Sequence, residues 1–458
     1  MKPFRILLCI LSVFAVLAAV CALGAGKSSV VRIPSLASVL GLPSESPEFI
    51  EPADSSLLAE SPAPSASADT LMVADTLPAK PKVVELPKAL PQTKLQLPLF
   101  YASLSSTDKQ SVRIVHFGDS QIEEDRISMI LRRRLQDRFG GGGIGLVPMV
   151  QTIPTYTAKQ TLEQNGHEIP YTSVRRYLAY GPSSMRMKDD NRYGPMAQVA
   201  CVEQPVDVSI ELLRDRVPTY DFSLVRVLCS DSVTVMIDSD SLPEYQSLIP
   251  LDEPRRDILL HFGGSGYVYG ISLETPTGIQ VDNIPMRGAA GTNFTFISRR
   301  QLETYFRQTN TTLVIMQFGG NAMPAIRTQT AVEKYVVAMR QQIQHVMAAA
   351  PDASLLFIGP SDMITTVEGE QMSYPMLPYL DRALSAMVNE EGGAYYSLFR
   401  LMGGAGSMFS WKEKGLAGED MVHFTRAGAK KVGEMLAKQL LADFDSMNEP
   451  VLNDSITQ

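Results

Sequence analysis

The chain has 458 residues, of which 45% are hydrophobic, and a formal net charge of −8. This length and apolar content exclude a disordered tail and a disulfide-stapled mini-protein, and they suggest two or three domains. A nucleic-acid binder needs a basic face to neutralise phosphates, so the negative charge argues against that class. The charge is uneven, because residues 40–79 carry a local −7 and no Lys or Arg, which leaves about −1 for the remainder.

The first 26 residues have the pattern of an export signal. Lys2 and Arg5 precede an uncharged stretch from Ile6 to Gly26, which is longer than the roughly 7–15 apolar residues of a cleaved signal and close to the roughly 20 of a spanning helix. We therefore interpret residues 1–26 as a signal anchor, with a cleaved signal peptide or a lipoprotein signal at Cys21 as alternatives. Each interpretation exports the body to the periplasm or cell envelope, and an anchor would hold it at the inner membrane.

Residues 27–97 are predicted to be an extended, acidic, proline-rich linker. Eleven of the 30 prolines lie between Pro34 and Pro98, and few hydrophobic residues recur there at a helical or strand period. Such a composition cannot bury enough surface to offset the entropy of ordering. The folded body is therefore expected to begin at residue 98.

The body opens with an apolar strand at residues 112–117, followed at once by Gly118, Asp119 and Ser120. An apolar stripe at helical spacing comes next, at residues 127–135. A strand, a tight turn and a helix in this order lift a serine hydroxyl to the end of a sheet, beside backbone amides that can stabilise an oxyanion. On its own, this turn could equally be a helix N-cap.

A second block lies near the other end of the chain. Asp420 precedes His423 by three residues, in a loop that leads into a final helix for which Thr425 is a candidate N-cap. At this spacing the carboxylate can hold the imidazole Nδ1, which leaves Nε2 free to accept a serine proton. The alternative is a surface Asp beside a structural His.

A third block ends a predicted buried strand at residues 311–318. Gly319, Gly320 and Asn321 follow that strand. An Asn just beyond the carboxyl end of a strand can direct its amide toward a developing negative charge. An ordinary turn Asn is the alternative.

Together these blocks resemble the SGNH (GDSL-type) hydrolase superfamily. Gly118-Asp119-Ser120 matches its nucleophile block and Asp420-x-x-His423 its last block, whereas Gly319-x-Asn321 is followed by Ala322 where the family often has Asp. The resemblance implies an α/β, flavodoxin-like three-layer fold, with a parallel sheet between helices on both faces. It also implies a reaction without metal or cofactor.

The resemblance further assigns roles to the site residues. Ser120 would attack an ester carbonyl, His423 would act as general base, and Asp420 would orient it. The backbone amides of Ser120 and Gly291, with the side chain of Asn321, would form the oxyanion hole, and Gly288 is the fallback for Gly291. Gly118, Asp119 and Gly319 would support these groups.

Ser120 and Gly291 are 171 positions apart, and the chain between them is expected to contain an inserted β-sandwich. Short runs with strand character recur there, and residues 224–228 and 232–238 look like paired strands. We therefore divide the body into hydrolase segments 98–145 and 279–446, an insert at 146–278 and a tail at 447–458. The insert resembles the carbohydrate-module-like domain of bacterial peptidoglycan O-acetylesterases.

Four further residues leave alternatives open. Cys201 and Cys229 could form a disulfide in an exported body, or remain two separate thiols. His116, on the first strand, is expected to be structural. Trp411 could line the cleft or belong to the core.

The resemblance suggests an esterase that removes O-acetyl groups from a cell-envelope or extracellular glycan, with peptidoglycan as the leading substrate. One rival is an O-acetyltransferase that uses the same residues and receives its acyl group from an acyl-exporting membrane protein. A second rival is a non-catalytic glycan-binding protein.

Overall fold

The computed structural model describes residues 94–180, 194–213, 219–237, 240–242 and 247–448. The predicted signal anchor at residues 1–26 lies outside these ranges, as do residues 27–93 of the predicted linker at 27–97 and residues 449–458 of the predicted tail at 447–458. Among the described helices, none combines the length and the hydropathy that a membrane crossing requires.

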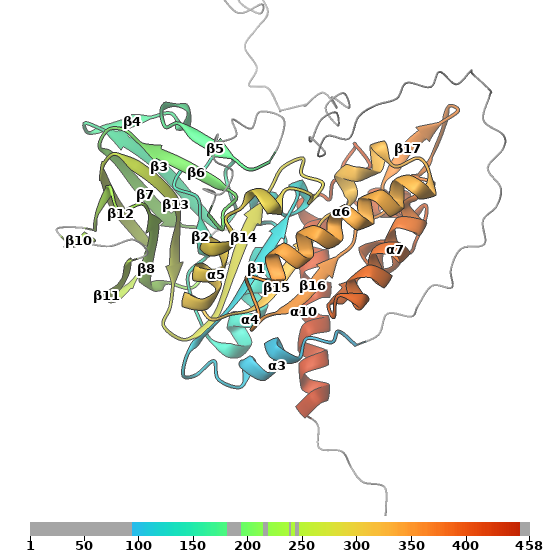
Figure 1. The fold of residues 1–458 in the computed structure, drawn as a ribbon, viewed down its shortest axis with the longest axis horizontal. Coiled ribbons are helices and arrows are strands. Elements are labelled where there is room, and N and C mark those ends of the chain that lie inside the picture. Colours follow the sequence, from blue (N-terminus) through green and yellow to red (C-terminus); the bar gives the residue numbers. More distant parts are fainter. Residues whose placement is uncertain (1–93, 181–193, 214–218, 238–239, 243–246, 449–458) are drawn as a thin grey trace, which may run out of the picture. The chain divides into compact units, whose positions relative to one another are not determined.

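A five-stranded parallel sheet forms the centre of the α/β part (Figure 1). Its order is β14-β1-β15-β16-β19, and each neighbouring pair is parallel. Numbered along the chain, this is the 2-1-3-4-5 order of flavodoxin-like sheets. The strands are β1 (Ser111–Gly118), β14 (Gly278–Pro285), β15 (Thr311–Gln317), β16 (Ser354–Ile358) and β19 (Ala394–Tyr396).

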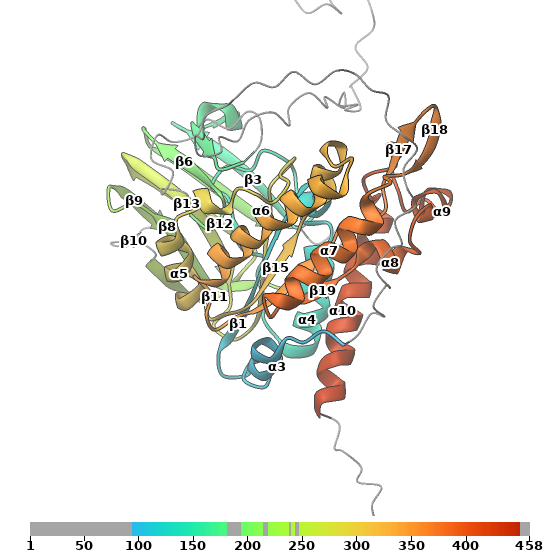
Figure 2. The ribbon, with the colours of Figure 1, turned by 45° about the vertical axis from the view of Figure 1, so that its right-hand side comes forward.

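Helices cover both faces of this sheet, because strand side chains alternate between the faces. On β1, Val112 and Ile114 join one buried cluster, while Val115 and Phe117 join the other. The first cluster includes α3 (Pro98–Leu104), α4 (Ser128–Phe139), α8 (Leu398–Met402), α9 (Ser407–Glu413) and α10 (Arg426–Asn448). The second includes α5 (Arg299–Gln308), α6 (Gln329–Met347) and α7 (Leu377–Glu390), and Figure 2 shows α6 and α7 over the sheet. The predicted three-layer α/β fold is confirmed.

Two antiparallel sheets lie between β1 and β14 in the chain. Their orders are β10-β9-β12-β7-β3-β4 and β11-β8-β13-β6-β5, with β2 also paired to β13. Val208 and Leu260 from one sheet share a buried cluster with Val227 and Ile271 from the other, so the two sheets form a sandwich. The strands are β2 (Gly145–Val147), β3 (Ala158–Gln164), β4 (His167–Ile169), β5 (Arg176–Leu178), β6 (Gln198–Val202), β7 (Val206–Leu212), β8 (Phe222–Cys229), β9 (Val233–Ile237), β10 (Asp240–Leu242), β11 (Ser247–Arg255), β12 (Asp257–Gly264) and β13 (Gly266–Glu274).

The predicted pairing of residues 224–228 with 232–238 is wrong. β8 pairs with β11 and β13, whereas β9 pairs with β10 and β12. A tight turn carries the chain from one sheet to the other. It is closed by a hydrogen bond that the Val233 amide donates to Ser230 O. Alternation along a strand reveals which side chains face the core, and it says nothing about which strand lies alongside.

Cys201 and Cys229 are both buried and both free. Cys201 lies opposite Tyr267 and Cys229 lies opposite Val268, so β13 runs between the two cysteines. Because neighbouring strands are about 4.8 Å apart, this places the cysteines roughly 10 Å apart. A disulfide needs a Cα separation of about 4.4–6.8 Å, so the geometry favours two separate thiols.

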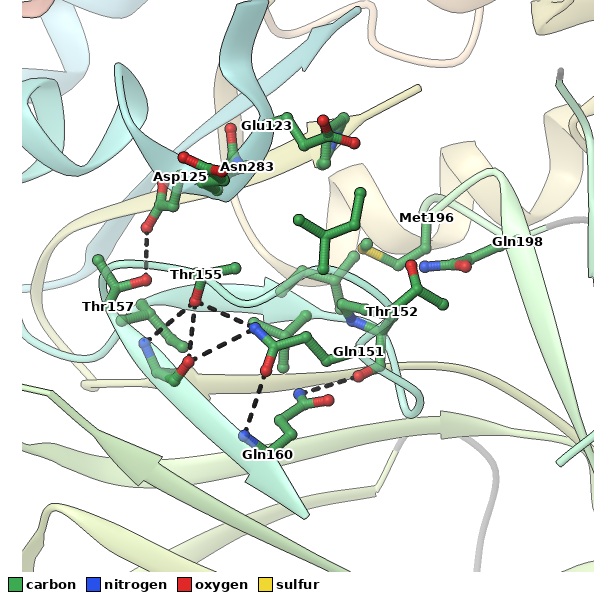
Figure 3. Close-up of a pocket in the computed structure, with 18 of the residues that line it drawn as sticks. Glu123, Asp125, Gln151, Thr152, Thr155, Thr157, Gln160, Met196, Gln198 and Asn283 are labelled. Atoms are coloured by element: carbon green, nitrogen blue, oxygen red, sulfur yellow. Dashed lines mark hydrogen bonds between the residues drawn. The ribbon is translucent and has the colours of Figure 1, made fainter. Parts of the chain in front are cut away.

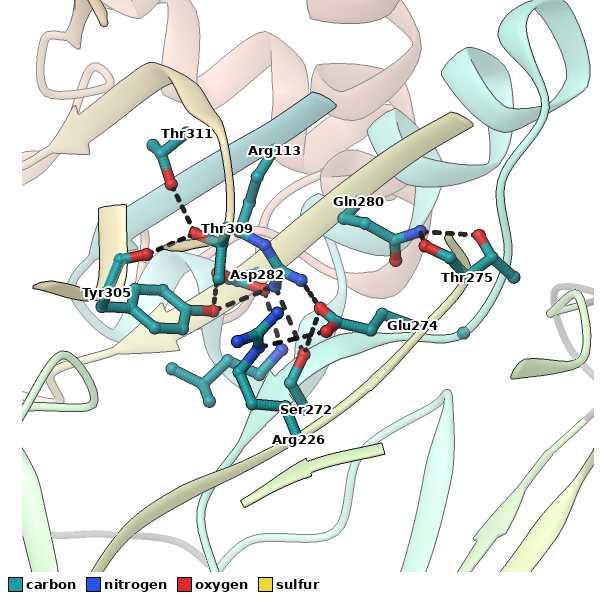
Figure 4. Close-up of polar contacts among 12 residues, drawn as sticks. Arg113, Arg226, Ser272, Glu274, Thr275, Gln280, Asp282, Tyr305, Thr309 and Thr311 are labelled. Carbon is teal, nitrogen blue, oxygen red and sulfur yellow. Dashed lines mark hydrogen bonds and ion pairs between the residues drawn. The ribbon is translucent and has the colours of Figure 1, made fainter. Parts of the chain in front are cut away.

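A buried cluster of charges joins the parallel sheet to the sandwich (Figure 4). Arg113 of β1 pairs with Asp282 of β14 at 2.6 Å and also with Glu274 at the end of β13. Arg226 of β8 contacts the other oxygen of Glu274 at 3.1 Å, and Tyr305 of α5 donates a hydrogen bond to Asp282 at 2.7 Å. Two cations therefore face two carboxylates, which offsets the desolvation that makes an unpaired buried charge so costly.

We predict that Arg113→Ala lowers the free energy of unfolding by about 3–5 kcal/mol, because Asp282 and Glu274 would stay buried without their cation. Urea denaturation followed by circular dichroism measures this loss. The control is Arg138→Ala, which removes an ion pair with Asp445 in which both side chains are more than half exposed. It should cost less than about 1 kcal/mol, and equal losses in the two variants would contradict the role given to the cluster.

Candidate active site

Ser120 lies at the carboxyl end of β1, where the strand gives way to a short 3₁₀ helix, η1 (Ser120–Asp125). Asp119 caps this helix, since its side chain accepts a hydrogen bond from the Gln121 amide at 2.9 Å. The predicted sequence of strand, turn and helix is present, with η1 placed before α4. The sharp turn leaves the Ser120 side chain at the rim of the sheet.

The structure brings Ser120 together with His423 and Asp420. Ser120 Oγ lies 2.9 Å from His423 Nε2, although 303 residues separate them. His423 Nδ1 lies 2.6 Å from Asp420 Oδ2. When Nδ1 carries the proton and donates to Asp420, Nε2 accepts from the serine, which is the arrangement that activates a serine nucleophile.

Asp420 remains ionised at neutral pH. Burial by itself would raise its pKa, but the hydrogen bond with the His423 imidazole and the two from backbone amides outweigh burial and lower the pKa to about 2. Those amides belong to Val422 and His423, each 3.0 Å from Oδ1. The carboxylate can therefore stabilise an imidazolium that forms when Ser120 loses its proton.

Gln121 and Arg126 hold the serine turn against the histidine loop. Gln121 Nε2 donates to Val422 O at 2.8 Å, and Gln121 Oε1 accepts from the Phe424 amide at 3.4 Å. Arg126 donates to the backbone carbonyls of both Ser120 and Gln121. Sequence reasoning did not single out either residue, and the only signal was a polar residue directly after the nucleophile.

Ser120 and His423 open onto a pocket of about 390 Å³, counting the part open to solvent. Its walls come from loops that follow β1, β15 and β16, with Asn321, Pro360 and Met363 among the lining residues. In open α/β sheets, ligands bind beyond the carboxyl ends of the strands. The position of this pocket follows that rule.

Asn321 lines the pocket, and its amide already has two acceptors. Nδ2 lies 3.2 Å from Asp119 Oδ2 and 3.2 Å from Ala289 O. An amide nitrogen has two hydrogens, so Asn321 must release one acceptor to hold an oxyanion. The turn before it requires a glycine at Gly319, whose φ of 122° lies in the left-handed region.

Gly291 packs inside the core. A Cβ at this position would lie 2.7 Å from atoms of both Phe318 and Met339, and its φ is 82°. Neither Gly291 nor Gly288 is among the residues that line the pocket beside Ser120. Their segment reaches the site through Ala289, whose carbonyl accepts the bond from Asn321, and the oxyanion role of Gly291 stays a prediction.

His116 and Trp411 lie in the core. The His116 ring contacts Gln317 at 3.1 Å and Ser128 at 2.9 Å, and burial lowers its pKa to about 4. Trp411 is 4% exposed and packs against Phe424, with ring centroids 5.3 Å apart. In the described residues, no group of three or more His, Cys, Asp or Glu is placed to hold a metal.

A solved structure titled as a peptidoglycan O-acetylesterase superposes on this chain with a TM-score of 0.62 and 20% sequence identity. The match covers 76% of this chain and 96% of the other. This chain therefore shares the fold of that structure, a five-stranded parallel sheet between helices with two additional antiparallel sheets, which is the fold that the sequence resemblance to SGNH hydrolases implies.

Two further solved structures match more distantly. One is a carbohydrate esterase family 2 enzyme with a carbohydrate-binding domain from Myceliophthora fergusii, at 13% identity and a TM-score of 0.27, covering 59% of this chain and 99% of that one. The other is an acetyl xylan esterase at 11% identity and a TM-score of 0.25, covering 36% of this chain and 80% of that one. Neither a protein-family model nor a curated protein matches the sequence.

Within the SGNH fold, the Asp420 carboxylate is predicted to control the reactivity of Ser120. Asp420→Asn should slow reaction of Ser120 with a fluorophosphonate probe by on the order of 10³–10⁴-fold, because the amide favours the wrong imidazole tautomer. The control is Asp207→Asn on the sandwich, where Asp207 contacts His261 Nδ1 at 2.8 Å in a second Asp–His pair. Equal labelling rates for Asp420→Asn and the wild type would exclude the proposed triad.

His116 gives a prediction for stability against pH. The pKa of His116 is about 4 in the folded protein, below its ordinary value of 6.5. Between pH 6.5 and pH 4 the unfolded chain therefore binds more protons than the folded protein, so the free energy of unfolding falls as the pH drops through this range. From pH 7 to pH 4.5 the loss from this group should be about 2–3 kcal/mol. Urea denaturation of the wild type and His116→Gln at both pH values isolates it, and an identical pH dependence in both proteins would contradict the assignment.

Proposed function

We propose that this protein is a serine esterase that removes O-acetyl groups from a cell-envelope or extracellular glycan, with peptidoglycan as its substrate. The observation that carries the proposal is the hydrogen-bonded series Ser120–His423–Asp420 at the mouth of a pocket. The SGNH fold supports it, because this fold is also that of a peptidoglycan O-acetylesterase.

The proposed reaction has two steps. Ser120 Oγ attacks the ester carbonyl carbon while His423 Nε2 takes the serine proton, and the tetrahedral intermediate collapses as the sugar oxygen leaves with that proton. Water then attacks the acetyl-serine, again with His423 as base, and acetate is released. The Ser120 amide and Asn321 Nδ2 would hold the oxyanion in both steps, and such a donor is typically worth about 10²–10³ in rate.

The shape and charge of the protein fit this substrate class. The pocket beside Ser120 is small and part of its wall is formed by Pro360 and Met363, which suits a short acyl group. Outside residues 40–79 the chain is close to neutral, which suits an uncharged sugar ester. We place the protein in the periplasm or cell envelope on the basis of the charge and hydropathy pattern of residues 1–26.

The test measures acetate released from O-acetylated peptidoglycan by the wild type and by Ser120→Ala. We expect release by the wild type and almost none by the variant, which lacks the nucleophile. Ser446→Ala on α10, whose hydroxyl bonds only to Asp443 O in the described residues, is the matched serine control and should retain activity. Equal release by the wild type and Ser120→Ala would overturn the proposal, and acetyl transfer to an added sugar without free acetate would assign the protein as an O-acetyltransferase.

A further inference from the structure

A second pocket is lined by Glu123, Glu124 and Asp125 at the end of η1 (Figure 3), whereas Ser120 and Gln121 at its start line the candidate active site. It contains about 730 Å³ of space, counting the part open to solvent. Glu123 and Asp125 of η1 form one side, and Gln151, Thr152 and Thr155 of the segment before β3 face them. The pocket is therefore built jointly by the hydrolase sheet and the inserted sandwich.

The sandwich side of this pocket offers neutral hydrogen-bonding groups. Three glutamine amides line it, from Gln151, Gln160 and Gln198. Gln160 Oε1 is buried without a hydrogen-bond partner among the described residues. Thr152 is exposed at the rim of the pocket. Amides and hydroxyls of this kind are the groups that fix the orientation of a polar, uncharged ligand.

Two of the three carboxylates that line the pocket are paired with arginines. Asp125 Oδ2 binds Arg132 at 2.6 Å, and Glu123 Oε2 binds Arg287 at 2.6 Å. The third, Glu124, forms a hydrogen bond with Tyr156. Because two carboxylates are neutralised by guanidinium groups and the third keeps its negative charge, the pocket does not favour an anionic ligand. Its apolar wall, which includes Ile153, suits the ring face or an N-acetyl methyl group of a sugar.

The backbone between the two pockets is strained. Glu124 and Asp125 have φ of 61° and 62°, a left-handed conformation that costs a non-glycine residue on the order of 1–2 kcal/mol. Bonds from Arg132 and from Thr157, at 2.6 and 2.8 Å, hold the Asp125 side chain in place. The strained segment therefore has a fixed position. Ser120 at the start of η1 lines the first pocket, and Glu123 in the same helix lines the second.

We propose that this second pocket binds a neutral, N-acetylated sugar unit of the same glycan chain whose ester reacts at Ser120. The inference rests on the proposed function. Glu123 lies three positions after Ser120, so their Cα atoms are at most about 11 Å apart. A glycan of a few sugar units can therefore contact both pockets, and binding in the second pocket would position the ester at the first.

Binding is tested by calorimetry with chitotriose, a neutral trimer of N-acetylglucosamine that has no ester to hydrolyse. We expect the wild type to bind, and Gln198→Ala and Thr152→Trp each to raise Kd at least tenfold, the first by removing an amide and the second by filling the pocket. The control is Gln164→Ala, an exposed amide on β3 that lies outside the pocket and bonds to Gln204. It should leave Kd unchanged.

Kinetics provide a second readout. Gln198→Ala and Thr152→Trp should raise KM for O-acetylated glycan while leaving hydrolysis of a small aryl acetate unchanged, since an aryl acetate occupies only the pocket at Ser120. No binding of chitotriose by the wild type, or equal Kd values for Gln198→Ala and Gln164→Ala, would overturn the second pocket as a sugar site. Chitotriose binding without acetate release from any ester would instead overturn the proposed function and leave the sugar site standing.

Discussion

The hydrogen bond between Ser120 and His423 is the constraint on which the site depends. It joins two residues 303 positions apart, so the serine turn and the histidine loop must each be held independently. Gln121 and Arg126 fix the loop from the serine side, since Gln121 donates to Val422 O and Arg126 donates to Phe424 O. On the other side Thr425 caps α10 through the Gly428 amide at 3.2 Å, so the final helix of the chain sets the position of the general base.

The inserted sandwich is joined to the hydrolase sheet by buried charges. Apolar contacts have no preferred direction, so an apolar interface would permit small shifts between the sandwich and the sheet. A guanidinium that binds two carboxylates fixes the direction of each hydrogen bond. Arg113 occupies that position between Asp282 and Glu274. The strands that carry these residues also lead into η1 and the second pocket, so the cluster fixes the relation between the sandwich and the catalytic serine.

The sequence allowed the fold class and the grouping of Ser120, Asp420 and His423 to be predicted, because each stands in a local pattern that resembles one superfamily. Contacts between distant residues outside those motifs were not predicted. The pairing of β8 and the roles of Gln121 and Arg113 depend on which segments meet in space, and a local pattern carries no information on that. Gly291 illustrates the same limit, since its place in the sequence matched an oxyanion glycine while its surroundings are Phe318 and Met339.

The strand that separates Cys201 from Cys229 has a consequence for how the protein matures. Both cysteines of the described body are buried and free. Cys229 lies in the aliphatic core of the sandwich, and burial raises its pKa to about 11. A thiol that stays protonated is a poor nucleophile toward oxidants and disulfides. Because neither described cysteine is in a disulfide, the folded sandwich does not depend on thiol oxidation.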